Sequence, residues 1–200
     1  MNEKKEKKAH GIQVLLRMVV RDPDGKIISD TGRKPTKSFV FQFLKFIYGM
    51  FRASGDYLAK ETSGASGIIY DESQDGTHHF RLNAALAQSL YGVVVGTGDT
   101  AEDNEDYALA TQLTEGVTAG KISHGAMIIG TAGVVGANVD LEVKRAFTNL
   151  TGSTITVKEA GVYVSRVGDY FCILRDVLPA AVDVYDKCSL TVYYTFRTTV

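Results

Sequence analysis

The chain has no tryptophan, three prolines and two cysteines in 200 residues. Two cysteines are too few for the disulfide framework of a small secreted domain, and Cys172 and Cys188 lack the spacing of a zinc site. Both lie in apolar, strand-like surroundings, so we expect two buried free thiols rather than a disulfide. No apolar run reaches the roughly 18 residues of a membrane-spanning helix. No apolar segment follows the N-terminal lysines, so we expect a soluble protein made in a cytoplasm, without a signal peptide.

The chain also has little net charge, −1 from 22 Lys and Arg against 23 Asp and Glu. A nearly neutral chain has no general attraction to nucleic acid, and we expect neither nucleic acid nor a membrane as a partner. The charges are nevertheless segregated. Residues 1–11 are predicted to form a flexible basic arm, whereas Asp99–Asp106 is almost wholly acidic. This asymmetry suits head-to-tail contacts between copies, although a solvated tail and a solvated loop explain it equally well.

The chain is rich in glycine, valine, threonine and tyrosine, which favours strands and turns. Short strand-like segments at even spacing predict a mainly β fold, an antiparallel, jelly-roll-like β-sandwich formed by residues 12–200 as a single domain. The D-P-D-G sequence at 22–25 predicts a hairpin. Residues 138–152, "NVDLEVKRAFTNLTG", predict a strand and alternate at Val139, Leu141 and Val143, and then at Ala146–Phe147. The predicted core residues are Leu141, Val143, Phe147, Ile155, Val157, Val162, Val164, Phe171 and Ile173.

One segment, "SFVFQFLKFIYGMF", has apolar residues at helical spacing and predicts a helix over 38–51 with Ser38 as its N-cap. Gln42 and Lys45 fall off the apolar face. A helix this aromatic must be buried against a sheet or against another subunit. We therefore expect contacts between copies from Phe39, Phe43, Phe46, Ile47, Tyr48 and Phe51. The Gly-, Ser- and Asp-rich residues 52–80 predict an extended loop with one short strand.

The stretch "GVVVGTGDTAEDNEDYALA" at 92–110 contains G-x-G-x-x-A after a predicted buried strand, Tyr91–Val95. A dinucleotide site would need a βαβ unit and room for phosphate, but acidic residues crowd this place. A calcium loop would need alternating carboxylates, which the order D-T-A-E-D-N-E-D lacks, although an incidental ion is an open alternative. We interpret the segment as structural, with two glycines turning the chain out of the strand and Asp99 or Asp106 capping backbone amides.

The histidine pair His78 and His79, near Asp75, is the best candidate for a metal-dependent enzyme site. Two neighbours in an extended chain point in opposite directions, so a loop pair without chemistry is favoured. Neither G-x-S-x-G nor H-E-x-x-H occurs in the sequence. We expect no enzyme, no cofactor and no catalytic residue.

Four blocks resemble, in order, a group of bacteriophage and prophage virion structural proteins: "KSFVFQFLKFIYGMF", "GVVVGTGDTAEDNEDYALATQL", "KRAFTNLTGSTITVKEAGVYV" and "ILRDVLPAAVDVYDKCSLTVYYTF". The G-T-G-x-T and D-Y-x-L elements lie in the second block. The third carries R-x-F-x-N-x-[ST]-G-x-x-I-T-V-x-E-x-G-x-Y, from Arg145 to Tyr163. The chain departs from the family in its lysine-rich arm and in its acidic run after Thr100.

This resemblance implies a non-enzymatic part of a tail, neck, fibre or capsid surface, located in the virion and bound to other virion proteins. We expect it to assemble with itself as a homo-oligomer or ring through hydrophobic and strand-edge contacts. The alternative is a fibre-tip carbohydrate- or receptor-binding module, with a host-surface glycan bound by some of the 10 tyrosines and by polar loops. Binding on a glycan array would distinguish the two functions.

Overall fold

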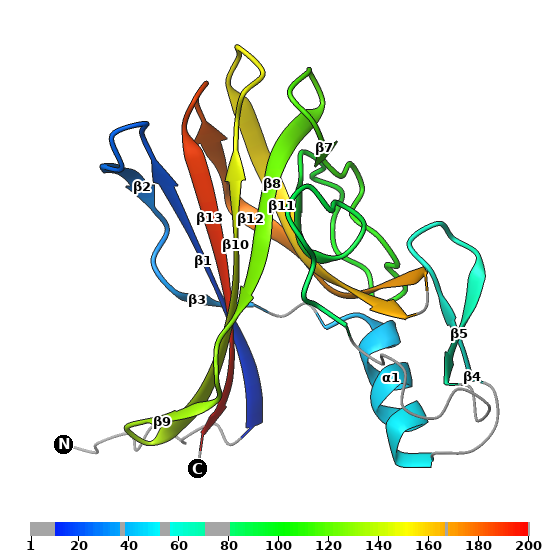
Figure 1. The fold of residues 1–200 in the computed structure, drawn as a ribbon. Helices are drawn as coiled ribbons and strands as arrows, with labels where there is room; N and C mark the ends of the chain where they lie inside the picture. Colours follow the sequence, from blue (N-terminus) through cyan, green and yellow to red (C-terminus); the bar gives the residue numbers. More distant parts are fainter. Residues whose placement is uncertain (1–10, 37–38, 53–56, 71–80, 167, 200) are drawn as a thin grey trace.

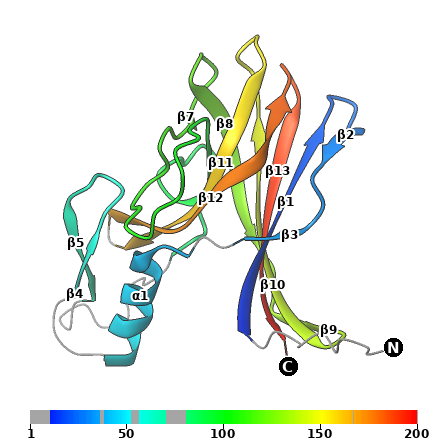
Figure 2. The same cartoon turned by 180° about the vertical axis from the view of Figure 1, so that it is seen from behind.

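The computed structural model describes residues 11–36, 39–52, 57–70, 81–166 and 168–199. These residues form a mainly β, sandwich-like fold in which two sheets face each other, and this confirms the predicted fold class (Figure 1). One helix and a small hairpin lie together at one side, as the reverse view in Figure 2 also shows.

The larger sheet contains eight of the described strands and is antiparallel except where β7 joins β8. Its order is β2 (Ile27–Asp30), β1 (Gly11–Arg21), β13 (Ser189–Thr199), β10 (Asn138–Thr148), β8 (Lys121–Ile129) and β7 (Thr114–Glu115), with β3 (Lys34–Pro35) on β1 and β9 (Gly133–Val135) on β10. The second layer has the order β12 (Asp169–Val184), β11 (Ile155–Arg166) and β6 (Gly92–Gly96).

The core lies between the two layers and matches the alternation of the sequence. Of the predicted core residues all are buried except Leu141, which is half-buried. All five residues of β6 are buried, as expected for the strand before the G-T-G segment. Cys172 and Cys188 are buried free thiols, which confirms that prediction.

The predicted hairpin at 22–25 joins β1 and β2. Gly25 has φ +83°, a conformation that glycine adopts without strain, and its N–H donates to the Asp22 carbonyl at 3.0 Å. The Asp22 carboxylate accepts the backbone N–H groups of Asp24 and Lys26 at 3.0 and 2.9 Å. The turn is therefore specified by its own four residues.

The helix α1 spans Phe41–Arg52, so the predicted start at 38 is wrong. Phe39 still pairs with Leu174 of β12, and the Phe41 N–H donates to the Asn104 carbonyl at 2.9 Å. The helix thus begins where the chain leaves the edge of β12, and Ser38 lies outside the described residues. Gln42 is also buried, contrary to expectation, because its side-chain oxygen accepts the Lys60 N–H at 3.1 Å.

The segment predicted as an extended loop with one strand instead contains a hairpin, β4 (Tyr57–Lys60) with β5 (Ser66–Tyr70), which packs beside α1. Its turn is closed by the Glu61 N–H, which donates to the Ala65 carbonyl at 2.9 Å, and by Gly64 at φ +87°. Residues 71–80 of the predicted loop lie outside the described residues.

Candidate assembly interface

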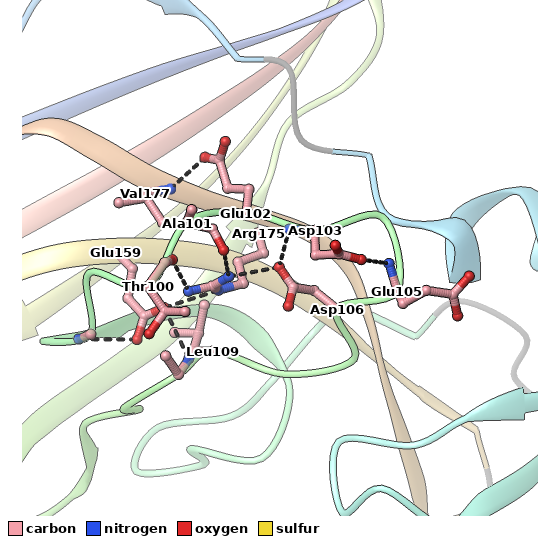
Figure 3. A network of polar contacts seen from close by, with 12 residues as sticks. Thr100, Ala101, Glu102, Asp103, Glu105, Asp106, Leu109, Glu159, Arg175 and Val177 are labelled. Atoms are coloured by element: carbon pink, nitrogen blue, oxygen red, sulfur yellow. Dashed lines mark hydrogen bonds and ion pairs between the residues drawn. The ribbon is translucent and has the colours of Figure 1, made fainter.

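The acidic loop after β6 is fastened to the outer face of β11 and β12 by a buried carboxylate, Glu159 (Figure 3). One oxygen accepts the N–H groups of Gly98 at 3.2 Å and Thr111 at 2.7 Å, and the other accepts that of Ala110 at 3.0 Å. Three backbone donors therefore converge on one carboxylate, as they would on a bound anion. The protein's own Glu159 occupies this place.

The glycines of G-T-G make room for Glu159. A Cβ on Gly96 or Gly98 would lie 2.6 Å from its Oε1, far closer than carbon and oxygen approach without a bond. Neither glycine is among those with positive φ, so their role is close approach and not the turn that we predicted. The segment is structural, but for a different reason.

Arg175 on β12 completes this network. Its Nε donates to Glu159 at 3.1 Å and its Nη1 to Asp106 at 2.6 Å, while Nη2 reaches the Thr100 carbonyl at 2.8 Å. Burial alone would lower the pKa of Arg175, but the two carboxylates outweigh it and raise the pKa. Three acidic residues of the loop are therefore bound to the fold. Asp106 pairs with Arg175, Asp99 pairs with Lys158, and the Glu102 carboxylate accepts the Val177 N–H.

Glu105 differs from those residues. Its side chain is exposed, and Figure 3 shows its carboxylate pointing away from Arg175. Its backbone N–H is held by Asp103 at 2.8 Å. The loop therefore keeps negative charge on its surface next to the start of α1.

A second buried cation, Arg145, was missed by the sequence analysis. It lies on the inward face of β10, fully buried, and donates only to backbone carbonyls among the described residues. Its acceptors are Gly125 at 2.7 Å, Val93 at 3.1 Å, Tyr91 at 3.2 Å, Ala85 at 3.4 Å, and Gln88. Burial lowers its pKa to about 10, so it stays charged at neutral pH. Arg145 joins the larger sheet to β6 and to the irregular segment before it.

His124 is buried beside Arg145. Its Nδ1 lies 2.8 Å from the Ile122 carbonyl and 3.1 Å from Glu115, so Nδ1 carries the proton of a neutral ring. Burial, and then the charge of Arg145, lower the pKa of His124 below its usual 6.5. The Glu115 carboxylate opposes this shift only in part.

This burial predicts that acid destabilises the protein. Below pH 6.5 the unfolded chain takes up a proton at His124 that the folded chain resists, so stability is complete above that pH and falls below it. The contribution of His124 is at most about 1.4 kcal/mol per pH unit. Urea unfolding at pH 7.5, 6.5 and 5.5 should show a fall that is smaller in His124→Gln. Equal slopes in both proteins would contradict the assignment.

The histidine pair His78 and His79, with Asp75, lies outside the described residues. In the part of the chain that the structure describes, no three His, Cys, Asp or Glu side chains are grouped as metal ligands. No helix formed by the described residues has the length and the apolar character that are needed to cross a membrane.

The predicted contact residues of the helix divide into two groups. Phe46 is buried and packs edge-on against Phe171, with ring centroids 5.2 Å apart, so it belongs to the chain's own core. Phe39, Phe43 and Ile47 are half-buried, and Tyr48 is 51% exposed. The Phe51 side chain is not described. Leu44, an apolar residue of the same helix, is 61% exposed.

Two hollows flank an apolar ridge on α1, which consists of Phe41, Leu44 and Tyr48. The first, of about 380 Å³, lies between the ridge and the β4–β5 hairpin. The second, of about 540 Å³, separates the ridge from the start of β1; we call it the sheet–helix groove. It is lined by Ile12, Phe39, Val40, Phe41, Phe43, Leu44, Asn104 and Glu105. Its walls are apolar and its acidic rim comes from Glu105.

The larger sheet extends beyond the layer that covers it, at the lower end in Figures 1 and 2. On the inward face of this sheet the paired residues Tyr194 and Val143 are covered, with 0% and 1% of their surface exposed. Val139, on the same face of β10 but closer to this end, is 42% exposed. We call this region the sheet end. Its exposed apolar residues are Ile12, Ile129, Val134 and Val139. The half-buried pair Leu141 and Phe196 lies between Val139 and the core.

A third hollow, of about 280 Å³, opens between β1 and β12. The carboxylate of Asp176 on its wall is almost fully buried and accepts the Tyr194 hydroxyl at 2.8 Å. Burial and this carboxylate raise the pKa of Tyr194, so the hydroxyl remains a donor. We interpret this pair as part of the packing between the layers.

Comparisons with protein-family models, with curated proteins and with solved structures find no match to this chain. The fixed positions of the pattern from Arg145 to Tyr163 all have structural contacts. Phe147 is in the core, buried Asn149 donates to the Ser153 and Val184 carbonyls, and the Tyr163 hydroxyl accepts the Leu109 N–H. The pattern is thus one of packing and hydrogen bonding.

Proposed function

We propose that the protein is a non-enzymatic structural component of a phage or virus-like particle, assembled with copies of itself and with other particle proteins. The observation that carries the proposal is the sheet end together with the ridge on α1. Large exposed apolar surfaces of this kind mark interfaces, since a monomer gains nothing by leaving them in water. The assignment to a phage or virus-like particle rests on the sequence resemblance to virion structural proteins.

The charged groups of the interior support the same proposal. Glu159, Arg175 and Arg145 are among the buried residues that an enzyme could use as acid, base or anion ligand, but each of these three is bound to the protein's own backbone. Perturbed pKa values can mark active sites, although structural networks also produce them. Here the partners of these groups account for their positions.

The tyrosines give less support to the alternative of a sugar-binding module. A sugar stacks on a free aromatic face, but the rings of Tyr91, Tyr107 and Tyr193 each have a cation over them. Lys60 lies 3.9 Å from the Tyr107 centroid, and Arg17 and Lys144 lie 5.6 and 5.5 Å from that of Tyr193.

We expect the purified protein to have a native mass that is a multiple of 21.7 kDa at micromolar concentration. Light scattering after size exclusion and native mass spectrometry would measure it. Particles purified from a culture that carries the gene should contain the chain at a stoichiometric level. A monomer at hundreds of micromolar that is absent from such particles would refute the proposed function.

A further inference from the structure

We infer that the sheet end and the sheet–helix groove are covered by the same region of a second copy of this chain. This inference rests on the proposed function and names its interface. The apolar hairpin formed by β9 and the first residues of β10 is the part of one copy that would enter the groove of the other.

The hairpin is unusual for an exposed sheet element. From Gly125 to Val139 the sequence is "GAMIIGTAGVVGANV", which contains no charged residue. Val134 and Val135 near its tip are 80% and 54% exposed. Proteins usually protect exposed strands with charges, with proline or with a covering element, because bare strands associate. This hairpin has neither charge nor proline, so its sequence suits an element that is covered in the assembled state.

The composition of the chain's other segments is unsuited to this cover. The groove needs apolar side chains, but residues 1–10, which precede Ile12, include four lysines, two glutamates and a histidine. Residues 71–80, "DESQDGTHHF", are similarly polar. The apolar hairpin of the same copy does not fill the groove either, because its strand β9 is already paired with the first residues of β10. The occupant must therefore come from another molecule.

The placement of the two surfaces favours a second copy. Ile12, Thr198, Val139 and Val134 lie in one row across β1, β13, β10 and β9. Val134 is thus three strands from Ile12, about 14 Å at ordinary strand spacing. Hairpin and groove stand at the same end of the molecule, so a two-fold contact can place each hairpin against the other groove.

Charge complementarity agrees with this arrangement. The lysine-rich residues 1–10 are joined to Gly11 at the sheet end, while Glu105 provides negative charge at the rim of the groove. The sequence before Gly11 is therefore opposite in charge to Glu105 at the groove that the second copy presents. Such complementarity steers association and excludes unrelated partners.

Val134→Glu tests the inference, with Leu86→Glu as the matched control. Both residues are exposed apolar side chains, 80% and 73%, but Leu86 lies in the segment beside β8, outside the sheet end. Val134→Glu should raise the dissociation constant of the oligomer about 10-fold or more, because it places a charge in an apolar contact. Leu86→Glu should leave the constant within about two-fold of the wild type, as an exposed change away from the interface. Sedimentation equilibrium measures all three proteins.

A second variant, Ile12→Glu, keeps the test valid if Val134→Glu fails to fold. Ile12 is 63% exposed on another strand, and its replacement should weaken association in the same way. Cross-linking gives an independent readout, because both native cysteines are buried. Copies with Val134→Cys mixed with copies with Leu44→Cys should be joined by a short bismaleimide.

The outcomes separate this inference from the proposed function. The proposed interface would be refuted if Val134→Glu and Ile12→Glu left the oligomer intact, or if Leu86→Glu weakened it equally. Either result would leave the proposed function, assembly with copies of itself, standing. A wild-type protein that is monomeric throughout would refute both. Weakening by the two sheet-end variants alone, with the mixed cross-link, supports the inference.

Discussion

Replacing Glu159 with alanine is expected to lower the free energy of unfolding by about 3–5 kcal/mol, which is the usual effect of removing one partner of a buried ion pair. The substitution leaves Arg175 buried with one carboxylate fewer, and it leaves the N–H groups of Gly98, Ala110 and Thr111 without their acceptor. Urea unfolding of the two proteins measures the loss. Amide hydrogen exchange at these three positions should accelerate first.

Two further variants show whether the loss arises from the network. Glu159→Gln preserves the volume but turns an NH₂ group toward N–H donors, so we expect a loss close to that of alanine. Glu142→Ala removes a surface carboxylate that pairs with Arg33 at 3.0 Å and should cost at most about 1 kcal/mol. A similar small loss for Glu159→Ala would show that the loop is held by other contacts.

Arg145→Met is expected to destabilise the protein by about 3 kcal/mol or more, because each buried carbonyl that loses its donor costs about 1–3 kcal/mol. Methionine fills much of the space but cannot donate to the carbonyls of Tyr91, Val93 and Gly125. The segment around Ala85 and Gln88 should loosen with it. Thermal unfolding and hydrogen exchange over residues 85–93 provide the measurement.

The control for Arg145 is Arg17→Met on the outer face of the same sheet. Arg17 pairs with Asp30 at 2.5 Å, but both side chains are about one-third exposed to solvent that screens the pair, so the loss of stability should be much smaller than at Arg145. Equal losses at positions 17 and 145 would contradict the role assigned to Arg145.

The parts of the fold that depend on neighbouring residues could be predicted from the sequence. The turn at 22–25 is specified by its own residues, and the β6 strand by five apolar positions in a row. The helix start was misplaced because it depends on distant groups. The edge of β12 keeps Phe39 extended, and Asn104 accepts the first helical N–H.

The buried charges could not be predicted because alternation alone treats a charged residue as an outward one. On β10 the inward positions continue without interruption through Val143, Arg145 and Phe147, whereas the predicted alternation passed from Val143 to Ala146–Phe147 and left Arg145 out. A usable signal did exist on the other sheet. Glu159 and Arg175 are opposite charges on the two strands of one hairpin, at similar distances from the turn at Gly168. The two glycines of the G-T-G segment complete this signal, because they leave room for the Glu159 carboxylate under the loop.

The pairing of β1 with β13 has a practical consequence for any fusion protein. Gly11 is opposite Thr199, so the polypeptide enters and leaves the fold beside Val139 and its neighbours. A bulky group attached next to Gly11 or Thr199 would stand beside the surface through which copies are inferred to meet, and would alter the oligomeric mass being measured. The turn at Asp22–Gly25, at the opposite end of the sheet in Figure 1, is the better site for a label.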